Sequence, residues 1–292
     1  MSRASNRCWV LQGSHALSLG DIDPIEVLRA VAGGVYEGFR TYGGQRVYRF
    51  GAHALRLESG RAQLKLGTAI DLQALGQGIE HVLHQLQNDH ASQDWKVRVD
   101  HAESNLRALG PLGECSALVV QAWPLNPVPQ TILDNGAHCA LEYKLARDHP
   151  EIKGTSFSLR RMQHNFPSGE NYESILVAPD GSLLEGVMSG LGFLQGSVLR
   201  TAGSGVLPSL TVESLCGLAE AKGLKVRREA LKADELAEID EAFLASSVRG
   251  IVPIRRIGEV EIGKGSSPQR TLELRSLLAT RARLDARSPA EG

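Results

Sequence analysis

Hydrophobic and polar positions follow two different periods along the chain, and the changes of period mark predicted strands and helices. Residues 35–42 and 46–50 are rich in β-forming side chains and flank a Gly-Gly-Gln sequence at 43–45. This pattern predicts a hairpin whose glycines adopt positive φ in the turn. Between residues 71 and 88 apolar side chains recur at helical spacing, which predicts a helix packed on the core. The stripe consists of Leu72, Leu75, Ile79, Val82, Leu83 and Leu86.

A proline-rich stretch at residues 124–129, with the sequence PLNPVP, is the segment most typical of a linker. A chain of 292 residues is long enough for about two domains. We therefore predict an N-terminal α+β domain over 1–124 and a C-terminal domain over 130–292.

Further elements are predicted on both sides of this linker from the same patterns. Before it, a helical period begins near residue 52, and strands are expected at 95–102 and 116–124. After it, a final helix is expected to begin at Ser267-Pro268, since serine caps helices and proline suits the first turn. The remaining elements predicted after the linker are strands at 137–143, 173–178, 191–195, 224–229, 241–247 and 250–257 and a helix at 211–223.

Composition and charge narrow the class of protein. The chain has 32 Lys+Arg against 33 Asp+Glu, 42% hydrophobic residues and 22% charged residues. These values argue against an intrinsically disordered chain and against a surface for nucleic acid. No apolar stretch approaches the roughly 18 residues of a membrane span, and the first residues lack a sustained apolar signal segment. We expect a soluble, cytoplasmic protein with no nucleic-acid or membrane partner.

The four cysteines are Cys8, Cys115, Cys139 and Cys216. They lie far apart, form no CxxC pair and have no neighbouring histidine cluster, so neither a zinc site nor a disulfide framework is indicated. We expect free thiols and no metal site.

Two features of the chain suggest chemistry. On the predicted hairpin, Tyr36, Gly38, Arg40 and Tyr42 share one face, which is either solvated or the wall of a cavity. Lys153 lies between apolar and small residues in the sequence PEIKGTSF. A partly desolvated amine can act as a nucleophile or a proton carrier, although the same sequence is also compatible with an ordinary surface lysine.

Taken together, several segments resemble the class IV pyridoxal-phosphate aminotransferases, a family that includes branched-chain aminotransferases, D-amino-acid aminotransferases and aminodeoxychorismate lyase. The resemblance extends over roughly residues 30 to 260, in the expected order. The segments that carry it are GVYEGFRTYGG at 34–44, HALRLESG at 53–60, EIKGTS at 151–156, DGSLLEGVMSGLGF at 180–193, LPSLTVESL at 207–215 and DEAFLASSVRGIVPI at 240–254.

The resemblance implies the cofactor pyridoxal 5'-phosphate (PLP) and assigns residues to it. Lys153 matches the lysine that holds the cofactor covalently and moves the proton at the substrate Cα. Glu185 matches the carboxylate that faces the pyridine nitrogen and keeps it protonated, so that the ring withdraws electrons. By itself, Glu185 fits better as a surface carboxylate at the end of a strand, and the cofactor role is favoured because Lys153 lies upstream and the strand around Glu185 is hydrophobic.

Further residues match the family's phosphate site. Leu210 and Thr211 stand at the entry to the 211–223 helix, where backbone N–H groups and the helix dipole favour an anion. Arg56 matches an arginine that grips the phosphate with its planar guanidinium. Ser246 and Ser247 match a hydroxyl pair that completes the site. A plain helix cap at Thr211 and a solvated Arg56 are the alternatives.

Substrate recognition is implied for three further residues. Tyr36 and Arg40 match a hairpin that forms a wall of the substrate pocket, and Arg98 matches a position used for the substrate carboxylate. A surface arginine is the alternative for Arg98, and Arg107, in the following loop, has no assigned role.

Two positions depart from the family pattern. The Ser-Asn usually found after the glutamate is Ser189-Gly190, and Phe157 stands where many relatives carry Tyr. These changes leave the core chemistry intact but do not fix the subtype.

The resemblance implies a homodimeric, α+β fold-type-IV enzyme with two domains, a barrel-like mixed sheet in the C-terminal one and the cofactor at their interface. The activity expected is transfer of an amino group between an amino acid and a 2-oxo acid, most like a branched-chain aminotransferase. Alternatives left open are a D-amino-acid aminotransferase, an aminodeoxychorismate lyase that releases pyruvate, and a relative without turnover. The amino acid used and its stereoisomer are not specified by the sequence.

Overall fold

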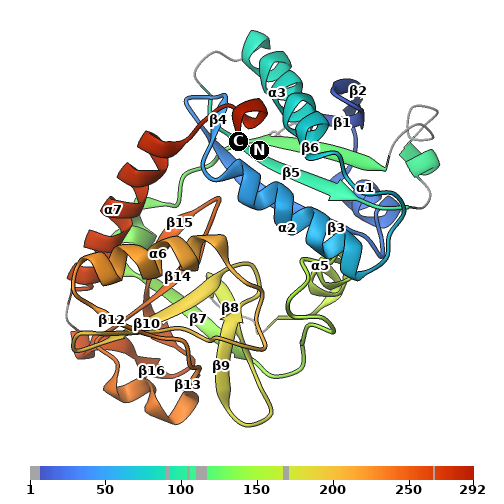
Figure 1. Ribbon diagram of the computed structural model, residues 1–292. Helices are drawn as coiled ribbons and strands as arrows, with labels where there is room; N and C mark the ends of the chain where they lie inside the picture. Colours follow the sequence, from blue (N-terminus) through green and yellow to red (C-terminus); the bar gives the residue numbers. More distant parts are fainter. Residues whose placement is uncertain (1–6, 90–92, 104–105, 110–116, 167–170, 266) are drawn as a thin grey trace. The chain divides into compact units, whose positions relative to one another are not determined.

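The computed structural model describes residues 7–89, 93–103, 106–109, 117–166, 171–265 and 267–292. The chain forms two compact units (Figure 1). The first contains the residues up to Asn126 together with 152–162 and 282–292, and the second contains 127–151 and 163–281. The first unit thus ends inside the predicted linker but takes in two segments that the sequence had placed in the C-terminal domain.

The first unit is built on a six-stranded sheet in which all neighbouring strands are antiparallel. The predicted strands at 95–102 and 116–124 both lie in it. In spatial order the strands are β2 (His15–Asp21), β1 (Arg7–Gln12), β6 (Leu118–Pro124), β5 (Trp95–His101), β3 (Val35–Tyr42) and β4 (Arg46–Val47).

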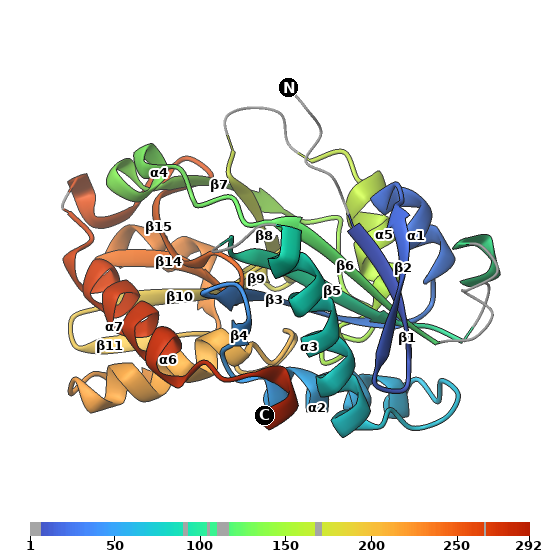
Figure 2. The ribbon, with the colours of Figure 1, turned by 90° about the horizontal axis from the view of Figure 1, so that it is seen from above.

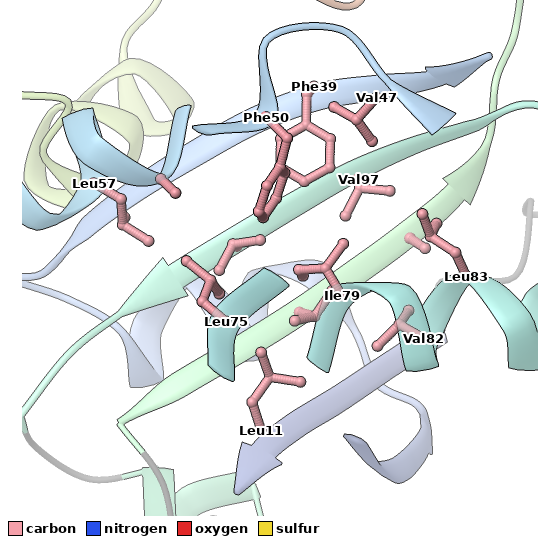
Figure 3. Close-up of a cluster of buried hydrophobic side chains, with 14 of the residues drawn as sticks. Leu11, Phe39, Val47, Phe50, Leu57, Leu75, Ile79, Val82, Leu83 and Val97 are labelled. Carbon is pink, nitrogen blue, oxygen red and sulfur yellow. The ribbon is translucent and has the colours of Figure 1, made fainter. Parts of the chain in front are cut away.

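Two helices, α2 (Phe50–Gln63) and α3 (Leu72–Asp89), pack on one face of this sheet. The helix predicted at 71–88 is therefore confirmed. Its apolar stripe faces the strands, with Leu75, Ile79 and Val82 directed toward the sheet (Figure 3). Burying such a stripe is the main source of stability of an amphipathic helix.

The predicted hairpin is present, with Gly43 and Gly44 at φ 64° and 81° in its turn. Its second strand is shorter than predicted, because β4 ends at Val47 instead of residue 50. Arg49 adopts a left-handed conformation with φ 55° and turns the chain directly into α2.

Smaller elements complete the first unit: α1 (Pro24–Ala30), the 3₁₀ helices η1 (Leu106–Leu109) and η5 (Pro289–Glu291), and most of α5 (Thr155–Gln163). The segment 282–292 is anchored to this unit, since Arg287 bridges Val47 and η5 contacts α3.

The second unit is built on a mixed sheet of ten strands. Pairs β11·β12, β15·β7 and β7·β8 are parallel, and the other pairs are antiparallel. In spatial order the strands are β12 (Lys225–Arg227), β11 (Val198–Arg200), β10 (Gly190–Gln195), β14 (Glu241–Ser246), β15 (Gly250–Ile257), β7 (Ala137–Glu142), β8 (Glu173–Val177), β9 (Ser182–Gly186) and β13 (Leu231–Lys232), and β16 (Val260–Glu261) pairs with β15.

The helices of the second unit are α4 (Gln130–Asn135), α6 (Leu210–Ala221), the 3₁₀ helices η3 (Ala233–Glu238) and η4 (Ile262–Gly265), and most of α7 (Gln269–Asp285). Helix α6 packs against β10, β12 and β14. Figure 2 labels α6 together with β10 and β14. The predicted strands and helices of this part of the chain are present, with boundaries moved by a few residues.

Among the residues that the structure describes, no helix is both long and apolar enough to cross a membrane. Cys8, Cys139 and Cys216 are free thiols, as predicted, and all three are buried. Cys115 lies outside the described residues, and so does the side chain of Arg107.

Candidate active site

In the first unit, Lys153 lies two residues before the start of α5, and its backbone is bonded to the start of β3. Its carbonyl oxygen accepts a hydrogen bond of 2.9 Å from the backbone N–H of Tyr36. Two residues later, the hydroxyl of Thr155 donates to the carbonyl oxygen of Val31 at 2.7 Å. This backbone attachment fixes the base of the Lys153 side chain, which is half-buried.

The side chain of Lys153 lies against Tyr36. Its Nζ is 4.8 Å from the centre of the Tyr36 ring, and the guanidinium carbon of Arg98 is 3.8 Å from the same centre. Cation–π attraction stabilises both contacts. Three residues assigned from the sequence are thus brought together in one unit.

Arg98 is paired with a carboxylate that the sequence analysis did not consider. Its Nε and Nη2 donate to Oδ2 and Oδ1 of Asp100 at 2.8 and 2.5 Å. Burial lowers the pKa of Arg98, but the charge and hydrogen bonds of Asp100, with a smaller contribution from Tyr36, together outweigh this effect and raise the pKa overall. Arg98 therefore stays charged next to a compensating anion.

Arg40 lies on the same face of β3 as Tyr36, as predicted. Its Nη2 donates to Oδ2 of Asp94 at 2.9 Å, and its guanidinium lies 4.9 Å from the ring centre of Tyr42. Asp94 also accepts from the backbone N–H of Gly44 in the hairpin turn, at 3.0 Å. These contacts fix Arg40 relative to the turn.

Arg56 projects from α2 toward a buried glutamate on β3. Its Nε and Nη2 donate to Oε1 and Oε2 of Glu37 at 2.6 and 2.8 Å, and Nδ1 of His53 lies 2.8 Å from the same Oε2. Burial raises the pKa of Glu37, but Arg56 and His53 outweigh this and lower it from 4.5 to about 2. Burial also lowers the pKa of His53. The orientation of Arg56 is thus set by Glu37.

In the second unit, Glu185 is a buried residue of β9 with a cationic partner. Its Oε1 accepts from Nε of Arg147 at 2.6 Å and from the backbone N–H of Leu207 at 3.3 Å. Both side chains are almost fully buried, with exposed fractions of 5% for Arg147 and 4% for Glu185. A buried carboxylate oriented in this way can stabilise a cationic ring nitrogen that faces it.

The N-terminus of α6 carries the predicted hydroxyl groups. Oγ1 of Thr211 lies 3.1 Å from Oγ of Ser247, and Ser209 caps the helix by accepting from the N–H of Val212 at 3.3 Å. Ser246, at the end of β14, accepts from the N–H of Arg249. Hydroxyls beside a helix N-terminus form a suitable site for an anion.

These residues of the second unit fit PLP. The short segment 207–211 begins with Leu207, whose backbone N–H donates to Glu185. It ends with Thr211, whose hydroxyl lies beside that of Ser247. It therefore connects a carboxylate suited to a pyridinium nitrogen with a helix N-terminus suited to a phosphate. Leu210, predicted for the same site, is the first residue of α6.

The structure explains the departure at Gly190. A Cβ atom added there would overlap Cγ2 of Val212 and lie 3.3 Å from Cβ of Ser209, both at the start of α6. Any larger side chain at position 190, including asparagine, therefore requires the Val212 side chain in the first turn of α6 to shift. At position 157, the Phe157 side chain is buried in the first unit.

Two partners that the sequence analysis missed had detectable signals. Asp100 follows Arg98 by two residues in a predicted strand, and a period of two places both side chains on one face. Glu37 shares one face of the predicted strand with Val35 and Phe39, an apolar setting in which a carboxylate needs a cation. Arg147, 38 residues before Glu185, gave no such local signal.

A family model described as amino-transferase class IV matches residues 34–257. The chain belongs to the class IV aminotransferase family. The match agrees closely with the resemblance seen over roughly residues 30 to 260.

Curated relatives of this class IV aminotransferase align over part of their length. A branched-chain-amino-acid aminotransferase of Salmonella typhimurium is 30% identical over 95 residues, which cover 32% of this chain and 31% of that protein. A transaminase of Alternaria alternata is 42% identical over 52 residues, covering 18% and 14% of the two chains. The aligned segments thus span at most about a third of these two relatives.

Solved structures match over almost the whole chain. A fold IV-transaminase from Curtobacterium pusillum superposes with a TM-score of 0.77 at 19% identity, covering 96% of this chain and 99% of that one. A branched-chain amino acid aminotransferase from Thermobaculum terrenum, in its PLP-form, gives a TM-score of 0.73 at 19% identity, with 97% and 98% coverage. The predicted α+β fold of type IV, with its barrel-like mixed sheet, is confirmed.

Proposed function

We propose that this chain is a PLP-dependent aminotransferase that transfers an amino group between an amino acid and a 2-oxo acid, with branched-chain amino acids as the expected donors. The observation that carries the proposal is the buried Glu185, joined through one short segment to the hydroxyl-lined N-terminus of α6, in a chain of the class IV family. The names of the relatives support the donor class.

Bound PLP supplies an electron-withdrawing ring that stabilises negative charge at the substrate Cα. Lys153 holds the cofactor through its Nζ and moves the Cα proton as a general base and acid. Its backbone attachment to β3 limits where Nζ can reach. Glu185, oriented by its ion pair with Arg147, would face the ring nitrogen and keep it protonated.

The phosphate is proposed to bind at the start of α6. There the hydroxyls of Thr211, Ser246 and Ser247 and the N–H groups following Leu210 donate to it. The family resemblance also assigns Arg56 to the phosphate, and Glu37 fixes the direction of its guanidinium within the first unit.

The substrate is proposed to lie against Tyr36 and Arg40, with its carboxylate recognised by Arg98. Asp100 holds two nitrogens of Arg98, so the guanidinium is oriented before substrate arrives. Such pre-organisation reduces the entropy lost on binding.

We further propose a cytoplasmic homodimer, the assembly implied by the family resemblance. Light scattering at two protein concentrations tests the dimer, and a monomer mass at both contradicts it.

The test of the function uses the purified chain mixed with PLP. We expect a visible absorption band that borohydride traps covalently on Lys153, and amino-group transfer to 2-oxo acids. Lys153→Ala should remove the band and lower the rate on the order of 10³-fold. Lys144→Ala, at an exposed lysine, is the matched control. Absence of the band in the unaltered protein overturns the proposal.

A panel of donors then separates the subtypes. Transfer from branched L-amino acids is expected, whereas transfer from D-amino acids alone identifies the D-amino-acid type. Release of pyruvate from aminodeoxychorismate without any 2-oxo acid acceptor identifies the lyase.

A further inference from the structure

Three residues of the second unit form a buried polar cluster that the proposed function does not use. Nη2 of Arg249 donates to Oε2 of Glu173 at 2.5 Å and to Oγ of Ser189 at 2.6 Å. Oγ of Ser189 also donates to the same Oε2, at 3.0 Å. We call Arg249, Glu173 and Ser189 the Arg249 clamp.

The clamp joins two turns that lie far apart in the sequence. One is the turn between β9 and β10, where the backbone N–H of Met188 donates to Oε1 of Glu173 at 2.8 Å. The other is the turn between β14 and β15, where the N–H of Arg249 donates to Oγ of Ser246 at 3.2 Å. Glu173, at the start of β8, thus receives hydrogen bonds from both turns.

These two turns adjoin the residues proposed for opposite ends of the cofactor. Glu185 precedes Met188 by three positions, and Ser246 and Ser247 precede Arg249 by three and two. A shift of one turn against the other would change the spacing between the carboxylate and the hydroxyl pair.

Stability alone is a weak explanation of the clamp. The Glu173 side chain is fully buried and the Arg249 side chain is 20% exposed, so the pair loses much of its hydration. A buried ion pair often stabilises a protein no more than an apolar pair of similar volume. The ion pair instead fixes the relative orientation of the two side chains, because hydrogen bonds between a guanidinium and a carboxylate form only in a narrow range of geometries. Tyr172, whose ring centre lies 5.2 Å from the Arg249 guanidinium, restricts it further.

We propose that the Arg249 clamp is a positioning device that fixes the spacing between the nitrogen-binding and phosphate-binding ends of the cofactor site. The proposal rests on the proposed function, since it takes PLP as the group that spans the two ends. Arg249 and Glu173 are positioning residues and do not touch the cofactor in this scheme.

The test compares two ligands. PLP contacts both ends of the site, whereas pyridoxal, which lacks the phosphate, contacts one. Loss of the fixed spacing should weaken only the ligand that has to satisfy both ends at once. Arg249→Met is expected to weaken PLP binding, measured by absorbance titration, about tenfold, and pyridoxal binding by less than about twofold. Equal losses for both ligands, or no loss for PLP, overturn the proposal.

Two further variants separate positioning from folding. Arg200→Met is the matched control, because Arg200 pairs with Glu235 at 2.7 Å in the same unit, has a side chain of similar burial and adjoins neither turn. It should leave the ratio of the PLP and pyridoxal affinities unchanged. The double variant Arg249→Met/Glu173→Met removes both charges and should recover thermal stability without recovering PLP affinity. Recovery of both overturns the proposal. Absence of the lysine-bound band in the unaltered protein would instead refute the proposed function.

Discussion

Arg56 and Glu37 face each other in a bidentate ion pair, with nitrogen–oxygen distances of 2.6 and 2.8 Å between α2 and β3. Glu37 is 1% exposed and the Arg56 side chain 14%. The pair brings a positive charge to a fixed place in the first unit and gives it a permanent partner. Removing the partner should therefore affect both stability and the placement of Arg56.

Glu37→Gln should destabilise the protein strongly. The substitution leaves Arg56 without its compensating charge in a largely buried position, which typically costs about 3–5 kcal/mol in the free energy of unfolding. Urea denaturation measures this loss. Asp180→Asn, which removes the exposed pair with Lys232, should change the midpoint very little. Equal effects of the two substitutions would contradict the assigned role of Glu37.

The same carboxylate should make stability depend on acid pH. Because the folded-state pKa of Glu37 lies at about 2, below the ordinary 4.5, its stabilisation is complete above about pH 4.5 and is lost as the pH falls toward 2. Urea titrations between pH 7 and pH 3 should show the unfolding free energies of the unaltered protein and of Glu37→Gln converging at the acid end. A constant difference over this range would show that Glu37 titrates normally in the folded state.

Substitution of Gly190 should disturb the proposed phosphate end of the site. An alanine Cβ at this position overlaps Val212 in the first turn of α6, and such overpacking costs about 1–3 kcal/mol. Gly190→Ala should lower the melting temperature and weaken PLP binding. The double variant Gly190→Ala/Val212→Ala removes the overlapping atom and should restore most of the PLP affinity. Failure of this rescue would mean that the affinity loss has another cause.

A second glycine of the same region should respond in the opposite direction. Gly217 lies on the exposed side of α6, and an added Cβ would meet nothing within 4 Å. Gly217→Ala should raise the unfolding free energy by about 0.5–1 kcal/mol, because alanine loses less backbone entropy in a helix. Chemical denaturation checks this. A decrease would show that the helix at 210–221 is not continuous through Gly217.

Arg98 provides a test of substrate recognition. Arg98→Met should raise the KM for the amino-acid donor on the order of tenfold while the cofactor band is retained, since a charge-assisted hydrogen bond to the carboxylate is lost. Arg46→Met, at an exposed position of β4, should leave KM unchanged. Loss of the cofactor band in Arg98→Met would instead show that Arg98 is needed for cofactor attachment at Lys153, which contacts the same Tyr36 ring.

The sequence predicted the elements whose pattern is local. The stripe from Leu72 to Leu86 defines α3, and the turn glycines define the hairpin, because both signals lie within a few residues. Short strands such as β13, with two residues, are too brief to show a period. They exist because neighbouring strands supply their hydrogen bonds.

At the candidate site, too, the sequence identified residues that lie in recognisable segments but not the contacts between distant segments. Lys153 and Glu185 were found through the order of the segments around them. The ion pairs Arg147–Glu185 and Arg249–Glu173 join positions 38 and 76 residues apart, and each pairs a loop or turn arginine with a strand glutamate that only the tertiary fold brings near it. Gly190 appeared in the sequence as a departure, and the reason for it lies in the first turn of α6.

The segment 282–292 belongs to the first unit, where Arg287 bridges Val47 and η5 contacts α3. During synthesis at about 5–20 residues per second, domains usually fold as they emerge, beginning from the N-terminus. Here the first unit also contains residues 152–162 and 282–292, so it cannot form all of its contacts until these segments have been synthesised. A nascent chain stalled at residue 126 should accordingly remain sensitive to protease.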